Sequence, residues 1–315
     1  MVSELVCLAE PVPGQRCGAP VERRDELTCV CTKCGTEYRV RGEVPHLIWG
    51  DLQPFNDHRE DGEFATYHEH HFGAFVPDEH PDSSAPAPTI WHEVGSAHAP
   101  SEIFYSTVLE AIRPHLPDVG LAVDVGCKLG RMAAEISAAG ADRTIGVDLG
   151  ATALEEARRI LFHPQGTPTL TFALRARRTR PVVAELPWRP SPDRLGFVCA
   201  DARRLPLRDG AADLVLLLNV VDATPNPAEV VREAWRCVAP GGRLVISDPF
   251  DYLDTGKRSG HIYELAGFLD ADDVVPDHYE TVVPFPLRVE WSQVVAVYQS
   301  NLAIFEKRRP QPSSA

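Results

Sequence analysis

The chain has 315 residues with 44% hydrophobic and 24% charged side chains, the balance of an ordinary globular protein of about two domains. No apolar run approaches the roughly 18 residues that span a bilayer, and the start of the chain lacks the segments of a signal peptide. We therefore expect a cytoplasmic protein with no membrane partner. The formal net charge is −14, and residues 51–100 alone carry ten acidic side chains against one basic one. Tight nucleic-acid binding needs a cationic footprint, so this distribution argues against a nucleic-acid partner.

Composition divides the chain into four segments. Residues 1–48 are rich in cysteine, residues 49–100 are acidic and rich in His and Pro, residues 101–310 alternate strand-like and helical patterns, and residues 311–315 form a polar tail that we expect to be disordered. Strands that alternate with crossover helices predict an α/β fold with a Rossmann-like, doubly wound parallel sheet. The predicted helices are 101–113, 131–139, 152–161 and 227–238, and the predicted strands are 121–125, 144–147, 196–199, 214–221, 243–247, 281–288 and 301–307.

The first segment carries a candidate metal site. Five of the eight cysteines lie within residues 7–34, and in a cytosolic chain such clustering indicates a metal and not a disulfide framework. The spacing Cys31-x2-Cys34 lets two thiolates reach one zinc ion. Cys7 and Cys17 supply the other pair, which closes the tetrahedron and makes the predicted site structural.

Two alternatives stay open for this segment. Cys29 is either the extra thiol or a replacement for Cys31, and a Cys-rich segment without metal is the competing interpretation of the whole pattern. The first 45 or so residues resemble the small zinc-ribbon module attached to many methyltransferases. The nine residues between Cys7 and Cys17 are more than that module usually has.

The second segment holds seven of the 12 histidines, between residues 58 and 98. A mobile polar linker is the interpretation that we favour for residues 49–100, because no ligand spacing fixes a geometry. A second metal site, or a catalytic base in a lid over a bound cofactor, is the alternative. Aromatic residues in this segment indicate that parts of it pack on the main domain: Phe64, Tyr67, Phe72, Phe75 and Trp91.

Residues 123–131 follow a predicted strand and open a predicted helix. Gly126 and Gly130 let the backbone approach a ligand closely, and the helix N-terminus favours a carboxylate there. Asp148 ends the next strand, where an acid can accept both hydroxyls of a ribose. Asp201 follows the third strand, where an acid can receive the amino group of an adenine. The loop does not fit the G-x-G-x-x-G spacing of a dinucleotide site.

The pattern D-x-G-x-x-x-G, with the two downstream acids and with Pro-Gly-Gly at 240–242 before a strand, resembles class I S-adenosylmethionine-dependent methyltransferases over roughly residues 120–250. The resemblance implies S-adenosylmethionine as the cofactor. Family members usually carry a small residue where this chain has Lys128. Three alternatives are open for this side chain: it pairs with the methionine carboxylate, it points outward, or it blocks the loop, in which case the domain is a non-catalytic relic. The implied cofactor site consists of Asp124, Gly126, Cys127, Lys128, Gly130, Asp148, Leu149, Asp201, Ala202 and Asn219.

In this fold the methyl acceptor lies over the end of the strand 214–221. Asn219 and Asp222 stand there and form the predicted catalytic pair. Such a pair can accept an N–H from an imidazole, which leaves the other ring nitrogen with a free lone pair for the methyl group. The alternative is that Asn219 contacts the cofactor and Asp222 caps the following turn. The first interpretation predicts that Asp222→Asn lowers turnover and leaves cofactor affinity nearly unchanged.

A second resemblance concerns the acceptor. The chain is similar to the ovothiol-pathway methyltransferase module, which methylates an imidazole nitrogen of 4-mercaptohistidine. This similarity implies an imidazole-type substrate beside Asp222, Phe250 and Tyr252. The chain departs from that family at Ala223, where an arginine is usual, and in the identity of the two aromatics. The matching stretches are 126–131, 219–222, 240–254 and 283–288, with an insertion at 162–195 in the same position.

Three functions therefore compete. The first is a methyltransferase that acts on a small molecule or a peptide, at an imidazole nitrogen of a histidine-derived substrate. The second is an RNA-base methyltransferase, since some zinc-ribbon methyltransferases modify ribosomal guanine, and the acidic charge weighs against it. The third is a non-catalytic scaffold whose ribbon docks a partner. The basic run at 175–180 is either a solvated loop or a grip for a carboxylate or phosphate.

Overall fold

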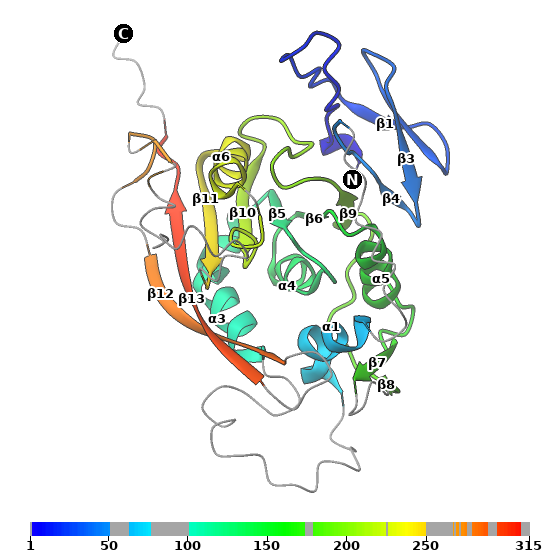
Figure 1. Cartoon of the computed structure of the whole chain (residues 1–315), viewed down its shortest axis with the longest axis vertical. Helices are drawn as coiled ribbons and strands as arrows, with labels where there is room; N and C mark the ends of the chain where they lie inside the picture. The colour runs from blue at the N-terminus through cyan, green and yellow to red at the C-terminus, as the bar shows by residue number, and fades with distance from the viewer. Residues whose placement is uncertain are drawn as a thin grey trace, which may run out of the picture.

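The computed structural model gives the molecule two bodies of unequal size, a large α/β domain and a small β module at the N-terminus (Figure 1). Predicted residues that fall outside the described ranges include Phe250, Tyr252, Trp91 and residues 175–178 of the basic run. The described residues are 2–50, 63–76, 101–173, 179–224, 226–249, 267, 269–270, 272–275, 279–288 and 295–309.

The large domain is built on one seven-stranded sheet. Its strands are β5 (Leu121–Val125), β6 (Arg143–Asp148), β9 (Leu195–Cys199), β10 (Ala212–Leu218), β11 (Val238–Asp248), β12 (Tyr279–Arg288) and β13 (Val295–Glu306). They lie in the order β12-β13-β11-β10-β5-β6-β9, and β13 runs antiparallel to both of its neighbours. The five strands from β11 to β9 are parallel. This confirms the predicted doubly wound sheet, and the winding reverses between β5 and β10.

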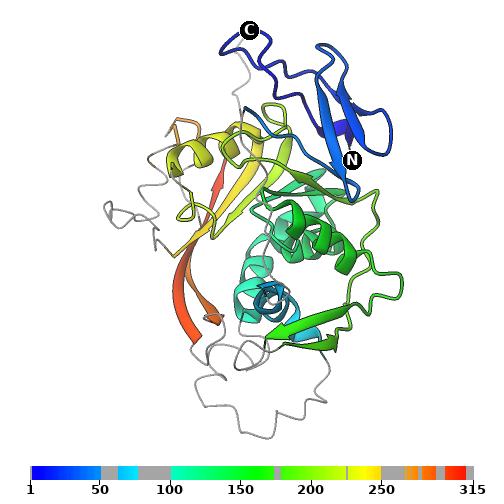
Figure 2. The same cartoon turned by 45° about the vertical axis from the view of Figure 1, so that its right-hand side comes forward.

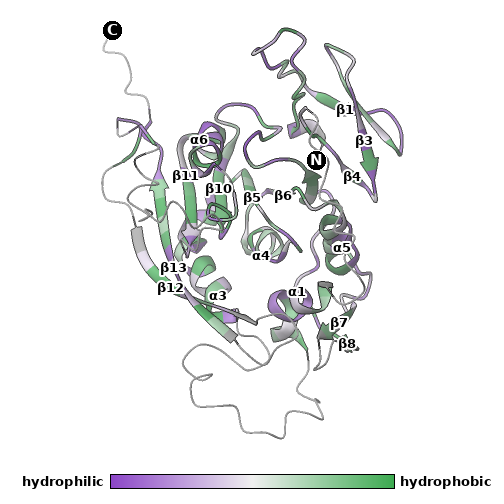
Figure 3. Cartoon of the chain, in the orientation of Figure 1, coloured by the Kyte–Doolittle hydropathy of each residue, from purple (hydrophilic) through white to green (hydrophobic). Residues whose placement is uncertain are grey.

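The parallel strands are apolar because both of their faces are covered. All five residues of β5 and all five of β9 are buried, as expected for a sheet with layers on both sides. Successive side chains of a strand therefore pack into the apolar cores on opposite faces of the sheet. Val123 packs toward one face and Ala122 toward the other. Figure 3 shows the hydrophobic colour concentrated on these strands.

One face of the sheet is covered by helices. They are α3 (Glu102–Ile112), α4 (Arg131–Ala139) and α5 (Ala151–Leu161). Their buried residues share cores with the strands, as Phe104 of α3 and Ile136 of α4 do with Ala122. A hairpin of β7 (Thr169–Ala173) and β8 (Thr179–Val183) occupies the predicted insertion and extends this layer.

Among the described residues, the other face is covered by one helix, α6 (Pro227–Cys237), and by the N-terminal module. The connection from β9 to β10 contains no helix, although a crossover between parallel strands usually does. Leu5 and Leu8 of the module share one core with Val198 of β9 and Trp235 of α6. Figure 2 shows the module lying across this part of the sheet.

The N-terminal module contains a four-stranded antiparallel sheet in the order β1-β2-β3-β4. Its strands are β1 (Val21–Arg23), β2 (Thr28–Cys31), β3 (Glu37–Arg41) and β4 (Val44–Pro45). The module is joined to the large sheet through the backbone, because the Leu47 N–H donates to the Cys199 carbonyl at 2.9 Å. Ion pairs such as Arg16–Glu233, at 3.1 Å, add to the junction.

Two element bounds differ from the prediction for physical reasons. The strand predicted at 214–221 ends at Leu218, because Asn219 takes a left-handed backbone with φ of 53° and turns the chain. The strand predicted at 243–247 begins earlier, at Val238. Pro240-Gly241-Gly242 therefore forms an irregularity inside β11, where the pairing register with β10 shifts, and not a stop before it.

The favoured interpretation of residues 49–100 as a mobile linker is wrong for residues 63–76. They form α1 (Glu63–Phe72) and the short helix η2 (Gly73–Phe75), which pack against β7 and β12 and against the apolar core around α5. The expected packing of aromatics holds for the described ones, since Phe72 is fully buried. Within the described residues no helix combines the length and apolarity that a membrane span requires.

Candidate functional site

The glycine loop between β5 and α4 is shaped by two positions that exclude a side chain. Gly126 has φ of 75°, and a Cβ there would lie 2.2 Å from Cγ2 of Val220. Gly130 has φ of 71°, and a Cβ there would meet the Phe197 ring at 2.6 Å. Glycine is therefore required at both places, and the loop lies against the end of β10.

Lys128 also has a left-handed backbone, with φ of 48°. Its N–H donates to Oδ2 of Asp148 at 2.9 Å. Its ammonium Nζ lies 4.6 Å from the centre of the Tyr67 ring on α1, within the range of a cation–π contact. The side chain thus links the loop to α1.

The two downstream acids lie where the sequence predicts, at the ends of β6 and β9. Asp148 Oδ1 accepts from the Gly150 N–H at 2.7 Å while its other oxygen binds Lys128, so the carboxylate is fixed. Asp201 is ion-paired with Arg203 at 2.6 Å and accepts the Arg203 backbone N–H at 2.8 Å.

Asp124 occupies the end of β5 beneath the loop and is 3% exposed. Burial raises the pKa of its carboxyl to about 7, and the neighbouring charge of Asp148 adds to the rise. This carboxyl can therefore gain or lose a proton near neutral pH, which makes it sensitive to any charge placed beside it.

Asn219 follows β10, and its side-chain oxygen accepts from Ser247 Oγ at 3.1 Å and from Ser300 Oγ at 2.9 Å. These two buried serines hold the amide in one orientation. Asp222 donates its backbone N–H to Oδ2 of Asp248 at 2.9 Å. A left-handed backbone at a non-glycine residue such as Asn219 is a common mark of a functional site.

These residues surround a cavity of about 470 Å³ at the carboxyl ends of β5, β6, β9 and β10. It brings together Asp124, Gly126, Cys127, Lys128, Asp148, Leu149, Asp201, Ala202 and Asn219 from the predicted set. Gly130 and Asp222 do not line it, whereas Ala223 and Thr224, next to Asp222 in sequence, do.

The cavity also has a wall from α1, a segment that the sequence analysis offered as a lid only in its alternative interpretation and without naming the residues that line the cavity. Tyr67, His70 and His71 of α1 line it, and further aromatic residues lie next to them. A signal was present, because these three stand at positions i, i+3 and i+4 and so share one face of a helix. The missed aromatic residues on the other elements are Phe104, Tyr105 and Phe285.

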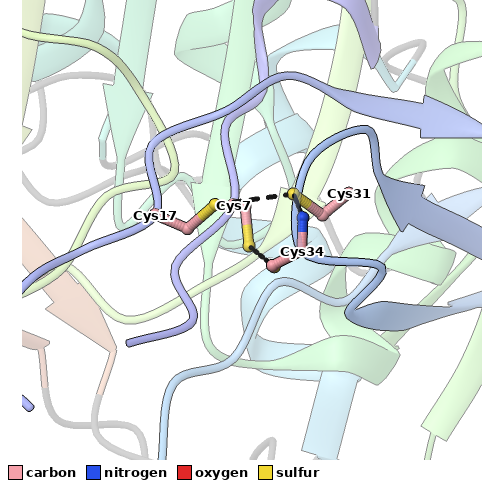
Figure 4. Close-up of side chains that lie close together, drawn as sticks. All are labelled: Cys7, Cys17, Cys31 and Cys34. Carbon is pink, nitrogen blue, oxygen red and sulfur yellow. Dashed lines mark hydrogen bonds between the residues drawn. The ribbon is translucent and has the colours of Figure 1, made fainter. Parts of the chain in front are cut away.

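The four predicted cysteines converge at the edge of the N-terminal module (Figure 4). Their sulfur atoms all lie within 4.8 Å of one another, with Cys7 and Cys34 at 3.6 Å and Cys17 and Cys31 at 3.7 Å. Cys29 is buried in the apolar core and is not one of the four. The structure thus selects one of the two cysteine sets that the sequence leaves open.

Hydrogen-bond donors lie beside two of the four sulfur atoms, those of Cys31 and Cys34. The backbone N–H groups of Lys33 and Cys34 donate to Cys31 Sγ at 3.4 Å. Hydrogen bonding from Thr36 lowers the pKa of the Cys34 thiol to about 6, while burial raises that of Cys7 to about 12. Four sulfur donors with N–H groups directed at one of them match the donor set of a tetrahedral structural zinc site.

Comparison with known proteins agrees with the geometry. Residues 123–246 match the model of a family described as a methyltransferase domain. A 37.1 kDa uncharacterized protein in a transposon of Streptomyces fradiae is 30% identical over 46% of this chain and 34% of its own length. A mitochondrial 2-methoxy-6-polyprenyl-1,4-benzoquinol methylase of Caenorhabditis elegans is 28% identical over 33% of this chain and 39% of its own.

The chain thus spans little more than a third of the length of these two relatives. A solved structure of an S-adenosylmethionine-dependent methyltransferase from Aquifex aeolicus is 14% identical, covers 64% of this chain and 88% of that one, and has a TM-score of 0.40. The family match covers the glycine loop and the acids that end β6 and β9. Residues 123–246 are therefore similar to a methyltransferase domain.

Proposed function

We propose that the whole chain is an S-adenosylmethionine-dependent methyltransferase that acts on a small molecule or a peptide, at a ring nitrogen of an imidazole. The observation that carries the proposal is the cavity at the winding reversal between β5 and β10, where the glycine loop meets three carboxylates. In open α/β sheets, ligands bind outside the carboxyl ends of the strands at this point.

The residues of the cavity fit an adenosyl sulfonium. Asp148 stands where a ribose needs a hydrogen-bond acceptor, and Asp201 with Ala202 stands one strand further along, where the adenine would lie. The backbone at Gly126 leaves the room that a Cβ would fill. Lys128 directs its ammonium group at Tyr67, which supports a role in holding α1 and not in plugging the loop.

When bound, S-adenosylmethionine supplies a methyl group already activated by its positively charged sulfur. The protein then has to align the acceptor and exclude water. Transfer to a neutral ring nitrogen moves the positive charge onto the ring. We assign to the Asp222 carboxylate, beside the cavity-lining Ala223 and Thr224, the stabilisation of that charge. Asn219, fixed by its two serines, positions the reacting groups.

We also propose that Cys7, Cys17, Cys31 and Cys34 hold one structural zinc ion. Four thiolates leave no open coordination position, so the ion has no part in methyl transfer. Its role is to fix the N-terminal loops that carry the cysteines.

Calorimetry tests the cofactor half of the proposal. The full chain is titrated with S-adenosylmethionine and with S-adenosylhomocysteine, and we expect one site per chain for each. Absence of binding to both would leave the domain as a scaffold and contradict the proposed activity.

Transfer of a labelled methyl group to histidine-derived imidazoles tests the acceptor half. We expect Asp222→Asn to lower turnover by at least about tenfold, because the ring cation loses a nearby negative charge, while the affinity for S-adenosylhomocysteine stays nearly constant. Asp118→Asn is the matched control, because it makes the same change at an exposed acid that is distant from Asp222 in sequence. A wild-type rate for Asp222→Asn would contradict the assignment of Asp222 to the acceptor site.

A further inference from the structure

Helix α1 presents one face to the cavity and is held rigidly. Ser101 Oγ donates to the His70 carbonyl, and Arg131 Nη1 donates to the His71 carbonyl at 2.9 Å. On its other side, His68 contacts Glu156 at 2.8 Å. The backbone that carries the cavity-facing histidines is therefore fixed from both sides, and their side chains are preorganised.

The two histidines differ in their hydrogen bonding. His71 Nδ1 is 2.8 Å from the Tyr105 hydroxyl. His70 is 6% exposed and belongs to the cavity lining, while its Nδ1 atom is buried and has no hydrogen-bond partner among the residues that the structure describes. Buried polar atoms are nearly always paired, so an unpaired one on a residue that lines a cavity points to a group whose hydrogen bond a ligand completes after a small movement of the ring.

The residues around His70 favour binding of a ligand with a flat, aromatic ring. Its imidazole meets the Phe285 ring edge-on at 5.1 Å between centres and the Tyr105 ring at 6.3 Å. Phe104 and Tyr67 complete this part of the cavity lining. Aromatic walls of this kind bind aromatic ligands by stacked or edge-to-face contacts.

The charges around His70 keep it neutral. Burial, with the nearby guanidinium of Arg131, lowers its pKa to about 3. Arg131 itself is charged and paired with Glu102 at 2.5 Å and Glu135 at 2.8 Å. The neighbouring His71 also has a pKa far below its usual value, chiefly because it is buried. At neutral pH, His70 thus retains a lone pair that can accept a hydrogen bond.

We propose that His70 is the residue that positions the methyl acceptor, its Nδ1 accepting a hydrogen bond from the N–H of an imidazole-type ring bound in the cavity beside the aromatic residues that line it. This inference rests on the proposed methyltransferase function and deepens it. The second ring nitrogen then has its lone pair free. That pair forms the new bond to the methyl carbon, the carbon–sulfur bond breaks with its electrons going to sulfur, and the N–H proton stays on the ring.

The test uses the full chain saturated with S-adenosylhomocysteine and two probes, imidazole and 1-methylimidazole, which lacks the N–H. We expect saturable binding of imidazole, at least about fivefold tighter than 1-methylimidazole. His70→Phe should abolish this preference, while His70→Asn, which keeps a polar atom near the Nδ1 position, should keep part of it. His115→Phe, outside the cavity, is the control and should behave as wild type.

The outcomes separate the two proposals. A chain that does not bind S-adenosylhomocysteine contradicts the proposed function itself. A chain that binds it and shows no preference for imidazole, or keeps the full preference in His70→Phe, overturns only the assignment of His70. If His70→Phe does not fold, the decision rests on His70→Asn. A reduced preference for imidazole with unchanged binding of 1-methylimidazole supports the hydrogen bond, and an unchanged preference refutes it.

Discussion

At the scale of single residues, the site is distinguished by a buried carboxyl whose charge state is not fixed. Asp124 lies under the glycine loop with a pKa of about 7, raised by burial and by Asp148. At neutral pH about half of the molecules carry the charge. A ligand with positive charge favours the carboxylate form, so binding of a sulfonium and release of a proton are coupled.

We therefore expect cofactor binding to release about half a proton at pH 7 and cofactor affinity to rise about tenfold from pH 6 to pH 8. The sign follows because the raised pKa falls when a cation binds, so the complex holds fewer protons than the free protein. Calorimetry in buffers of different ionisation enthalpy measures the release. Asp124→Asn should remove both effects, and a pH-independent affinity in the wild type would contradict this role for Asp124.

At the scale of elements, the cofactor loop and the end of β10 form one unit. Gly126 and Val220 are in such close contact that a larger side chain at Gly126 would clash with Val220. The left-handed Asn219 directs the chain from β10 toward the loop, and its N–H donates to the Ser247 carbonyl at 2.7 Å. The loop conformation thus depends on an element nearly a hundred residues away.

Gly126→Ala should lower the melting temperature and weaken binding of S-adenosylhomocysteine by at least about tenfold. Two costs add, the clash with Val220 and a left-handed backbone that disfavours alanine by about 1–2 kcal/mol. Val220→Ala in the same chain should recover the part due to the clash. Val220→Ala alone is the control, and a double variant no better than Gly126→Ala would show that the contact is not the cause.

At the scale of the whole molecule, the N-terminal module is part of the core of the methyltransferase domain. It covers the sheet face that lacks a crossover helix between β9 and β10. It also contacts the segment after Asp201, because the Val6 N–H donates to the Pro206 carbonyl at 2.9 Å and Arg204 is paired with Glu10 at 2.5 Å. We therefore expect loss of order in the module to change the cavity that contains Asp201.

We expect about one zinc ion per chain by elemental analysis. Removal of zinc with a chelator should lower the melting temperature and weaken cofactor binding together, since the loops that carry Cys7 and Cys17 lie on the sheet. Cys34→Ser should reproduce the effect. Cys29→Ala should keep the metal, because Cys29 lies outside the cluster. A metal-free chain with unchanged cofactor affinity would show that zinc binding and cofactor binding are not coupled.

The sequence by itself determined the central sheet and the position of the glycine loop for which we propose cofactor binding. The strand 121–125 and the helix 131–139 match the structure residue for residue, because long apolar and periodic patterns are local signals. Glycines and acids at strand ends could be found in the same way.

Tertiary structure decided the rest. The helix that carries His70 and His71 has a weak apolar pattern, and its burial depends on distant residues, among them Arg131 and Ser101, which donate to its carbonyls. The choice of Cys7, Cys17, Cys31 and Cys34 over Cys29 depended on where distant loops meet. Such contacts join residues far apart in the chain, and no local pattern records them.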